Sequence, residues 1–192
     1  MATVTKQGSF IMKQIRKNVF ETNSSSTHSI CISKAPVSPG DWVYFHIGEY
    51  GWENDCVDIA DYLYTAILSM DDSEQLLKRL QDILDKHSIE YDFEEPEYSG
   101  DEDYKWLSYG YIDHSYDTRE FIDTVLADEG MLMRCLFGDS CVYTGNDNQD
   151  DRPAGCNIAD EYFWEYDEHG QWVQKLNPHH DKENFDYFYK GN

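Results

Sequence analysis

The stretch CVDIADYLYTAILSMDDSEQLLKRLQDILDKHS, residues 56–88, sets the architecture of this chain because it holds two consecutive amphipathic helices. Apolar residues recur at helical spacing in the first half, at Ile59, Leu63 and Ile67. The second half carries a longer apolar stripe, made of Leu76, Leu77, Leu80, Ile83 and Leu84. We expect Asn54 or Asp55 to cap the first helix and Ser73 to cap the second.

Outward from these helices, alternating and aromatic-rich segments predict β-strands. They lie within residues 13–21, 28–33, 41–48, 89–93, 104–114 and 140–145, and a hairpin is expected at 161–176. The segment 41–48 is aromatic on both faces, which favours a central strand. A helix is predicted from Thr118 to Asp128, followed by a break near Gly130 and a second helical piece ending at Phe137.

This order of elements predicts an α+β fold, a single domain in which a largely antiparallel sheet packs with about four helices. The length of 192 residues suits one compact domain, which we place at residues 12–192. Residues 1–11 are expected to be a flexible leader. The polar but aromatic tail after residue 176 is expected to dock on the domain.

Charge is the strongest global feature of the sequence. The 38 acidic and 15 basic residues give a net charge of −23 and an isoelectric point near 4.4. Residues 1–34 carry +4, so the remaining residues carry −27. A field of this size repels nucleic acid and anionic membranes and attracts basic proteins. Two interpretations stay open: charge that keeps the protein soluble, and a surface that imitates the phosphate backbone of nucleic acid.

Cysteine usage and the absence of apolar runs bear on the compartment. Five cysteines, an odd number, show no CxxC spacing, which favours free, mostly buried thiols in a reducing environment. The N-terminus lacks the continuous apolar core of a signal peptide, and no run approaches the length of a membrane span. We therefore expect a cytosolic protein that makes no membrane contact.

The segment VFETNSSSTHSICIS, residues 19–33, is rich in hydroxyl groups and is followed by a strand-like pattern. It suits three roles: a polar turn, a contact for an anion or nucleotide, and a nucleophile beside a base. A ligand site here would use Arg16, Lys17, Asn23, Ser24, Ser25, Ser26, Thr27 and His28. No glycine lies between Val19 and Ser33, so the segment is not a Walker or dinucleotide-binding loop.

Catalysis at this segment would need His28 to reach both a serine and an acid. Neighbouring side chains on a strand point to opposite faces, so Thr27 and Ser29 are expected to diverge from His28. Asp113 is one candidate for the acid of a triad. No G-x-S-x-G elbow is present, and we assign no catalytic residue.

A second candidate surface lies in residues 90–103, where acidic residues occur without a basic one. They are Glu90, Asp92, Glu94, Glu95, Glu97, Asp101, Glu102 and Asp103. Such a run is typical of an exposed loop. Aromatic residues alternate with these acids, and the combination suits a groove lined by Arg and Lys.

The sequence predicts no metal site and no cofactor. Its seven histidines are scattered, and no H-E-x-x-H or paired-cysteine pattern occurs. The loop GNDNQDD at residues 145–151 is rich in oxygen ligands but lacks the spacing and terminal Glu of a calcium loop.

Several short motifs resemble a family of proteins encoded by phages and prophages of Gram-positive and gut bacteria. The longest is IRKNVFETNSSSTHSI at residues 15–30, and the shorter ones are GEYGWE, YIDHS and TGNDN. The resemblance implies a phage or mobile-element origin and gives no residue a catalytic role. As a class, small acidic phage proteins resemble inhibitors of host defence, namely anti-restriction and anti-CRISPR proteins.

The leading hypothesis is therefore a phage-type acidic binding protein that inhibits a host defence nuclease or another basic nucleic-acid-binding complex. The hypothesis includes mimicry of nucleic acid. The alternative is a protein that binds or processes a nucleotide or phosphorylated small molecule through residues 23–28. The sequence leaves the oligomeric state open.

Overall fold

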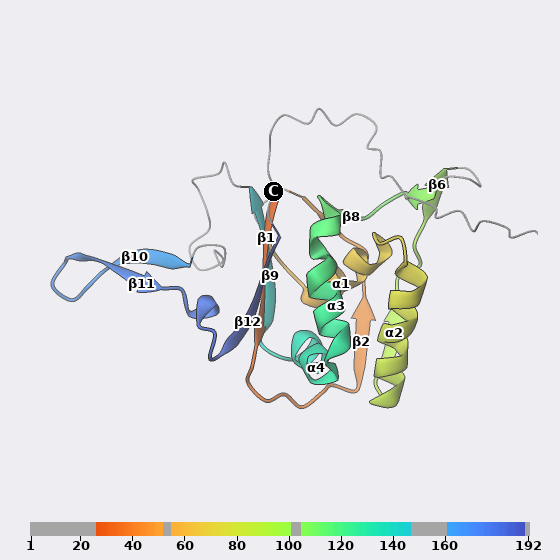
Figure 1. Cartoon of the computed structure of the whole chain (residues 1–192), viewed down its shortest axis with the longest axis horizontal. Coiled ribbons are helices and arrows are strands. Elements are labelled where there is room, and N and C mark those ends of the chain that lie inside the picture. The colour runs from red at the N-terminus through yellow and green to blue at the C-terminus, as the bar shows by residue number, and fades with distance from the viewer. Residues whose placement is uncertain (1–25, 52–54, 101–104, 147–160, 191–192) are drawn as a thin grey trace, which may run out of the picture.

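The centre of the fold is a four-stranded sheet in the order β12–β1–β9–β4, in which every neighbouring pair is antiparallel (Figure 1). The computed structural model describes residues 26–51, 55–100, 105–146 and 161–190. The strands of this sheet are β1 (Ser26–Ser33), β4 (Asp55–Val57), β9 (Ser140–Asn146) and β12 (Phe185–Lys190). The predicted strand at 13–21 and the expected leader at 1–11 lie outside the described residues.

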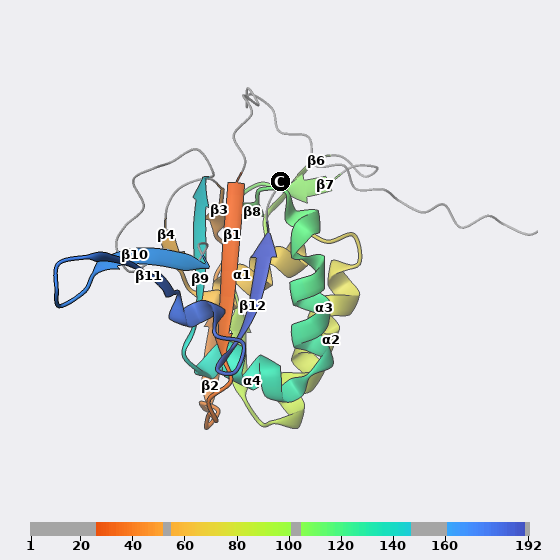
Figure 2. The same ribbon diagram turned by 60° about the vertical axis from the view of Figure 1, so that its left-hand side comes forward.

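Four α-helices cover one face of this sheet (Figures 1 and 2). They are α1 (Ile59–Leu68), α2 (Ser73–Lys86), α3 (Arg119–Ala127) and α4 (Glu129–Phe137), and two short 3-10 helices are η1 (Ser115–Thr118) and η2 (Pro178–His180). Helices gathered on one face of a mainly antiparallel sheet define an α+β fold, so the predicted class is confirmed.

Three further strand pairs lie beside the main sheet. They are β2 (Trp42–Phe45) with β5 (Glu90–Phe93), β3 (Glu49–Tyr50) with β8 (Tyr111–Ile112), and β6 (Tyr98–Gly100) with β7 (Lys105–Leu107). The prediction that β2 is a central strand is wrong, because in the described part of the chain it pairs with β5 alone. Its second aromatic face is partly open to solvent, with Trp42 56% exposed.

The predicted helix caps are also wrong, and the reason is local pairing. Residues 55–57 pair with β9 as strand β4, so α1 starts only after Asp58. The Asp58 side chain then accepts hydrogen bonds from the amides of Ala60 and Asp61. Ser73 is the first residue of α2 rather than its cap, which is Asp72.

The core forms between the helices and the sheet. In α1 only Asp61 is partly exposed, while α2 buries Leu76, Leu80, Ile83 and Leu84 as the predicted stripe requires. The break between α3 and α4 falls at Asp128, whose side chain accepts a hydrogen bond from the Met131 amide. The tail docks as expected, because β12 joins the sheet beside β1.

The predicted hairpin is confirmed as β10 (Tyr162–Tyr166) paired with β11 (Trp172–Leu176). It projects from the side of the sheet that faces away from the helices (Figures 1 and 2). The segment containing η2 links this hairpin back to β12.

Candidate functional site

The hydroxyl-rich segment enters the structure as β1, the strand between β12 and β9. All eight of its residues are buried, and Ser26, Thr27, His28 and Ser29 are between 0% and 7% exposed. The other predicted ligand-binding residues, Arg16, Lys17, Asn23, Ser24 and Ser25, lie outside the described residues. The three described residues of the candidate site therefore lie in the middle of a sheet rather than in a turn.

His28 is fixed in one neutral form by two buried partners. Its Nε2 lies 2.9 Å from the carbonyl oxygen of Gly51, which only accepts hydrogen bonds, so Nε2 carries the proton. Its Nδ1 then accepts from the Tyr62 hydroxyl of α1 at 2.7 Å. Burial, and secondly the nearby charge of Lys190, lower the pKa of His28 from 6.5 to about 3.

This arrangement leaves His28 no free nitrogen for catalysis. A general base needs one ring nitrogen on the nucleophile and the other on an orienting group. Here Tyr62 and Gly51 occupy those two positions, so neither ring nitrogen is left to bind Asp113. The expected divergence of neighbours is confirmed, because Ser29 accepts a hydrogen bond from Tyr187 of β12 instead.

The beginning of β1 also holds a buried cation. Lys190, at the end of β12, is 1% exposed and donates to the Ser26 hydroxyl at 2.7 Å and to the Ser26 carbonyl at 3.2 Å. A buried ammonium group is costly unless it is well hydrogen-bonded. The Ser26 hydroxyl therefore has a structural role in the described part of the chain.

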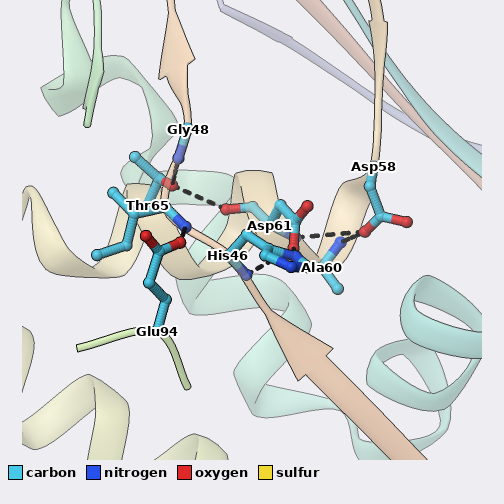
Figure 3. A network of polar contacts seen from close by, with 8 residues as sticks. His46, Gly48, Asp58, Ala60, Asp61, Thr65 and Glu94 are labelled. Atoms are coloured by element: carbon cyan, nitrogen blue, oxygen red, sulfur yellow. Dashed lines mark hydrogen bonds and ion pairs between the residues drawn. The ribbon is translucent and has the colours of Figure 1, made fainter. Parts of the chain in front are cut away.

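The predicted acidic loop is partly ordered into strands, and one of its acids serves the fold. The three consecutive amides of the turn after β2 are each held by a side chain (Figure 3). Asp61 accepts from His46 at 2.7 Å, Glu94 from Ile47 at 2.8 Å, and Thr65 from Gly48 at 3.1 Å. Glu94 thus ties β5 to this turn and is only partly exposed.

Other predicted acids border a shallow groove of about 550 Å³ beside the β2–β5 pair, which we call the acidic groove. It is lined by Trp42, Asp85, Ser88, Ile89, Glu90, Tyr91 and Asp92. Its lining thus combines three carboxylate residues with two aromatic residues. Partial burial, and secondly the Asp85 carboxylate, raise the pKa of Tyr91, as expected where negative charge gathers.

Basic side chains of the described chain are largely used in ion pairs on other elements. Lys86 binds Glu129 at 2.7 Å, and Arg119 binds Asp72 and Asp123, each at 2.8 Å. Glu95 and Glu97 are exposed, whereas Asp101, Glu102 and Asp103 lie outside the described residues. No ion pair to Glu90 or Asp92 occurs within the described ranges.

In the described residues, no group of three or more His, Cys, Asp or Glu side chains is arranged to hold a metal ion. None of the described helices has the length and apolar character needed to span a bilayer. The described cysteines Cys31, Cys135 and Cys141 form no disulfide.

Comparison of the chain with protein-family models, curated proteins and solved structures found no match. The geometry of the groove must therefore carry the functional argument. Sequence reasoning named Glu90 and Asp92 but missed Trp42 and Asp85, which lie far apart along the chain. The sequence feature that could have pointed to the groove is Trp42, an aromatic residue at the start of the β2 segment.

Proposed function

We propose that this chain is a phage-type acidic binding protein that inhibits a basic host protein, a defence nuclease or related nucleic-acid-binding complex. The observation that carries the proposal is the acidic groove, whose lining combines three carboxylate residues with Trp42 and Tyr91. An Arg or Lys side chain of a partner meets both opposite charge and an aromatic face there. The net charge of −23 extends the same attraction over longer distances.

Inhibition would follow from competition. A channel that binds nucleic acid is lined by Arg and Lys, and an acidic protein seated on those side chains blocks access of the phosphate backbone. Guanidinium groups suit this groove best, because a planar guanidinium pairs with a carboxylate while stacking on Trp. The phage origin remains part of the proposal and rests on the N-terminal motif.

The test measures DNA cleavage by purified defence nucleases, a Cas9-type complex and a type I restriction endonuclease, at increasing concentrations of this protein. Glu90→Gln with Asp92→Asn removes two charges from the groove, and Glu120→Gln with Glu183→Gln removes two exposed charges elsewhere. We expect the groove variant to weaken inhibition about 10-fold and the control variant to change it less than about 2-fold.

Salt dependence provides the second readout. Raising NaCl from about 50 mM to about 300 mM shortens the Debye length and must weaken an interaction built on exposed charges. Lack of inhibition of both nucleases, or inhibition that is equal at both salt concentrations, would refute the proposal.

Nucleotide binding at residues 23–28 is the second candidate, favoured by one observation. The buried ammonium group of Lys190 lies against Ser26, at the point where residues 23–25 join β1. Thermal-shift titration with ATP, GTP and cyclic dinucleotides, on the wild type and on Ser25→Ala, tests it. A ligand-induced shift that the variant loses would rank this function first.

A further inference from the structure

The β10–β11 hairpin has one strongly apolar face, which we call the aromatic face. Residues that pair directly across an antiparallel ladder lie on the same face, and here Tyr162 faces Leu176 and Tyr166 faces Trp172. The aromatic face consists of Tyr162, Trp164, Tyr166, Trp172 and Leu176. Each of these side chains is between 44% and 60% exposed.

The other face of the hairpin is different in chemistry. It carries Phe163, Val173 and an ion pair between Lys175 and Glu165. A two-stranded ribbon with one apolar and one mixed face is normally packed on a core through the apolar one. This hairpin instead projects away from the sheet, and the aromatic face stays open to solvent (Figures 1 and 2). Contiguous exposed aromatic surface of this kind marks an interaction site.

The turn of the hairpin and one of its ring pairs are preorganised. In its turn, the Asp167 carboxylate accepts hydrogen bonds from the amides of His169 at 2.9 Å and Gln171 at 2.8 Å, and Gly170 supplies a φ of +71°. The rings of Tyr166 and Trp172 are 4.0 Å apart, so they hold each other in place. Because little conformational freedom remains to be lost, docking costs less entropy.

Charge decides which occupant suits the face. Residues 161–176 carry four acidic residues and one lysine, a net charge of −3. Nucleic acid is repelled by the chain, and a second copy would bring another charge of −23. A cationic segment is attracted, and the guanidinium of Arg stacks on Trp and Tyr while its charge meets the surrounding carboxylates.

We propose that the aromatic face docks an arginine-rich segment of the partner protein. This inference rests on the proposed function and deepens it: the partner is held at two places, by charge at the acidic groove and by aromatic contact at the hairpin. Trp164 is the central anchor, because it sits in the middle of β10 opposite Gln174. Buried Trp and Arg side chains typically dominate such interfaces.

The test uses defined peptides with the full-length protein. A 12-residue peptide with six arginines and its six-lysine counterpart are titrated calorimetrically at about 50 mM salt against the wild type, Trp164→Ala and Phe163→Ala. Trp164→Ala leaves the Tyr166–Trp172 contact in place, and Phe163→Ala is a matched truncation on the opposite face. Circular dichroism on all three proteins checks that the fold is retained.

We expect the arginine peptide to bind more tightly than the lysine peptide. Trp164→Ala should weaken the arginine peptide about 10-fold, and Phe163→Ala should change it less than about 2-fold. Equal losses in both variants, or no loss in Trp164→Ala while the wild type binds, would overturn the inference and leave the acidic groove as the binding site.

Two further outcomes separate the inference from the proposed function. Failure of both peptides to bind a wild-type protein that still inhibits a nuclease would overturn the inference and leave the proposed function standing. Sedimentation velocity that shows a dimer in the wild type and a monomer in Trp164→Ala would assign the aromatic face to a second copy, against the inference alone.

Discussion

Replacing His28 with Gln should change how the free energy of unfolding depends on pH. In the folded chain His28 stays neutral, since burial holds its pKa at about 3, whereas in the unfolded chain the pKa is 6.5. Between these values the unfolded state binds more protons, so stability falls as the pH is lowered through 6.5. Linkage gives a loss of about 2 kcal/mol between pH 7.5 and pH 5.0 from this residue alone.

Several charged groups surround His28, and the comparison must cancel them. Lys190 of β12 and His114 oppose protonation, while Asp113 favours it, and Tyr62 of α1 donates to the ring. Gln at position 28 retains hydrogen-bonding groups but does not titrate. The difference between the wild-type and variant profiles therefore isolates the proton uptake of His28.

The assay is urea denaturation followed by circular dichroism, at pH 7.5, 6.5, 5.5 and 5.0. The control is His169→Gln, a substitution of a histidine whose side chain is 75% exposed in the hairpin turn. We expect the His28→Gln profile to be flatter than the wild type by about 2 kcal/mol, and the His169→Gln profile to follow the wild type within about 0.5 kcal/mol.

Parallel profiles for the wild type and His28→Gln would refute this reasoning. They would mean that His28 takes up a proton in the folded state as readily as in the unfolded one. A buried ring with both nitrogens occupied is incompatible with that result, so the serine–histidine strand would have to be open to solvent and available as a site.

Two more predictions concern the turn after β2, and urea denaturation at neutral pH measures both. Glu94→Ala removes the carboxylate that accepts a hydrogen bond from the Ile47 amide, and it should lower the free energy of unfolding by about 1.5–3 kcal/mol. The control Glu95→Ala, at an exposed neighbour, should lower it by less than about 0.5 kcal/mol. Equal losses would contradict a structural role for Glu94. Gly110 has a φ of +87°, and a methyl group added at this position would contact Ile47. Gly110→Ala should therefore lower the free energy of unfolding by at least about 2 kcal/mol. An unchanged free energy of unfolding would contradict this backbone conformation.

Much of the fold could be predicted from sequence because the decisive signals are local. The apolar stripe through Leu76 and Leu80 faces the core as its spacing indicates. The alternating pattern of residues 161–176 predicted the two strands of the hairpin and its turn, and both are present. Strand partners could not be predicted, since pairing depends on contacts between distant residues. Trp42 and Glu90 pair in parallel only because two helices lie between their strands.

The candidate sites were harder to predict for a related reason. A run of hydroxyl-bearing residues has the same sequence pattern in a solvent-exposed loop and in a buried strand. The hydrogen-bond partners of the side chains distinguish the two cases. For Ser26 the partner is Lys190, 164 residues away along the chain. Glu90 and Asp92 are exposed, as the sequence indicated, but the groove also needs Trp42 and Asp85 from two other segments.

The hydroxyl-rich motif gains a physical explanation from its position between two covering layers. Helix α1 lies against one face of β1 through Tyr62 and His28, and the η2 segment lies against the other, where the Cys31 thiol is 3.8 Å from the His179 carbonyl. Polar side chains buried on both faces need partners, and β12 supplies them through Lys190 and Tyr187. The motif therefore joins the two ends of the described chain. Because its described polar groups are used in this way, the proposed binding of a cationic partner is assigned to the periphery, where carboxylates and aromatic side chains are exposed.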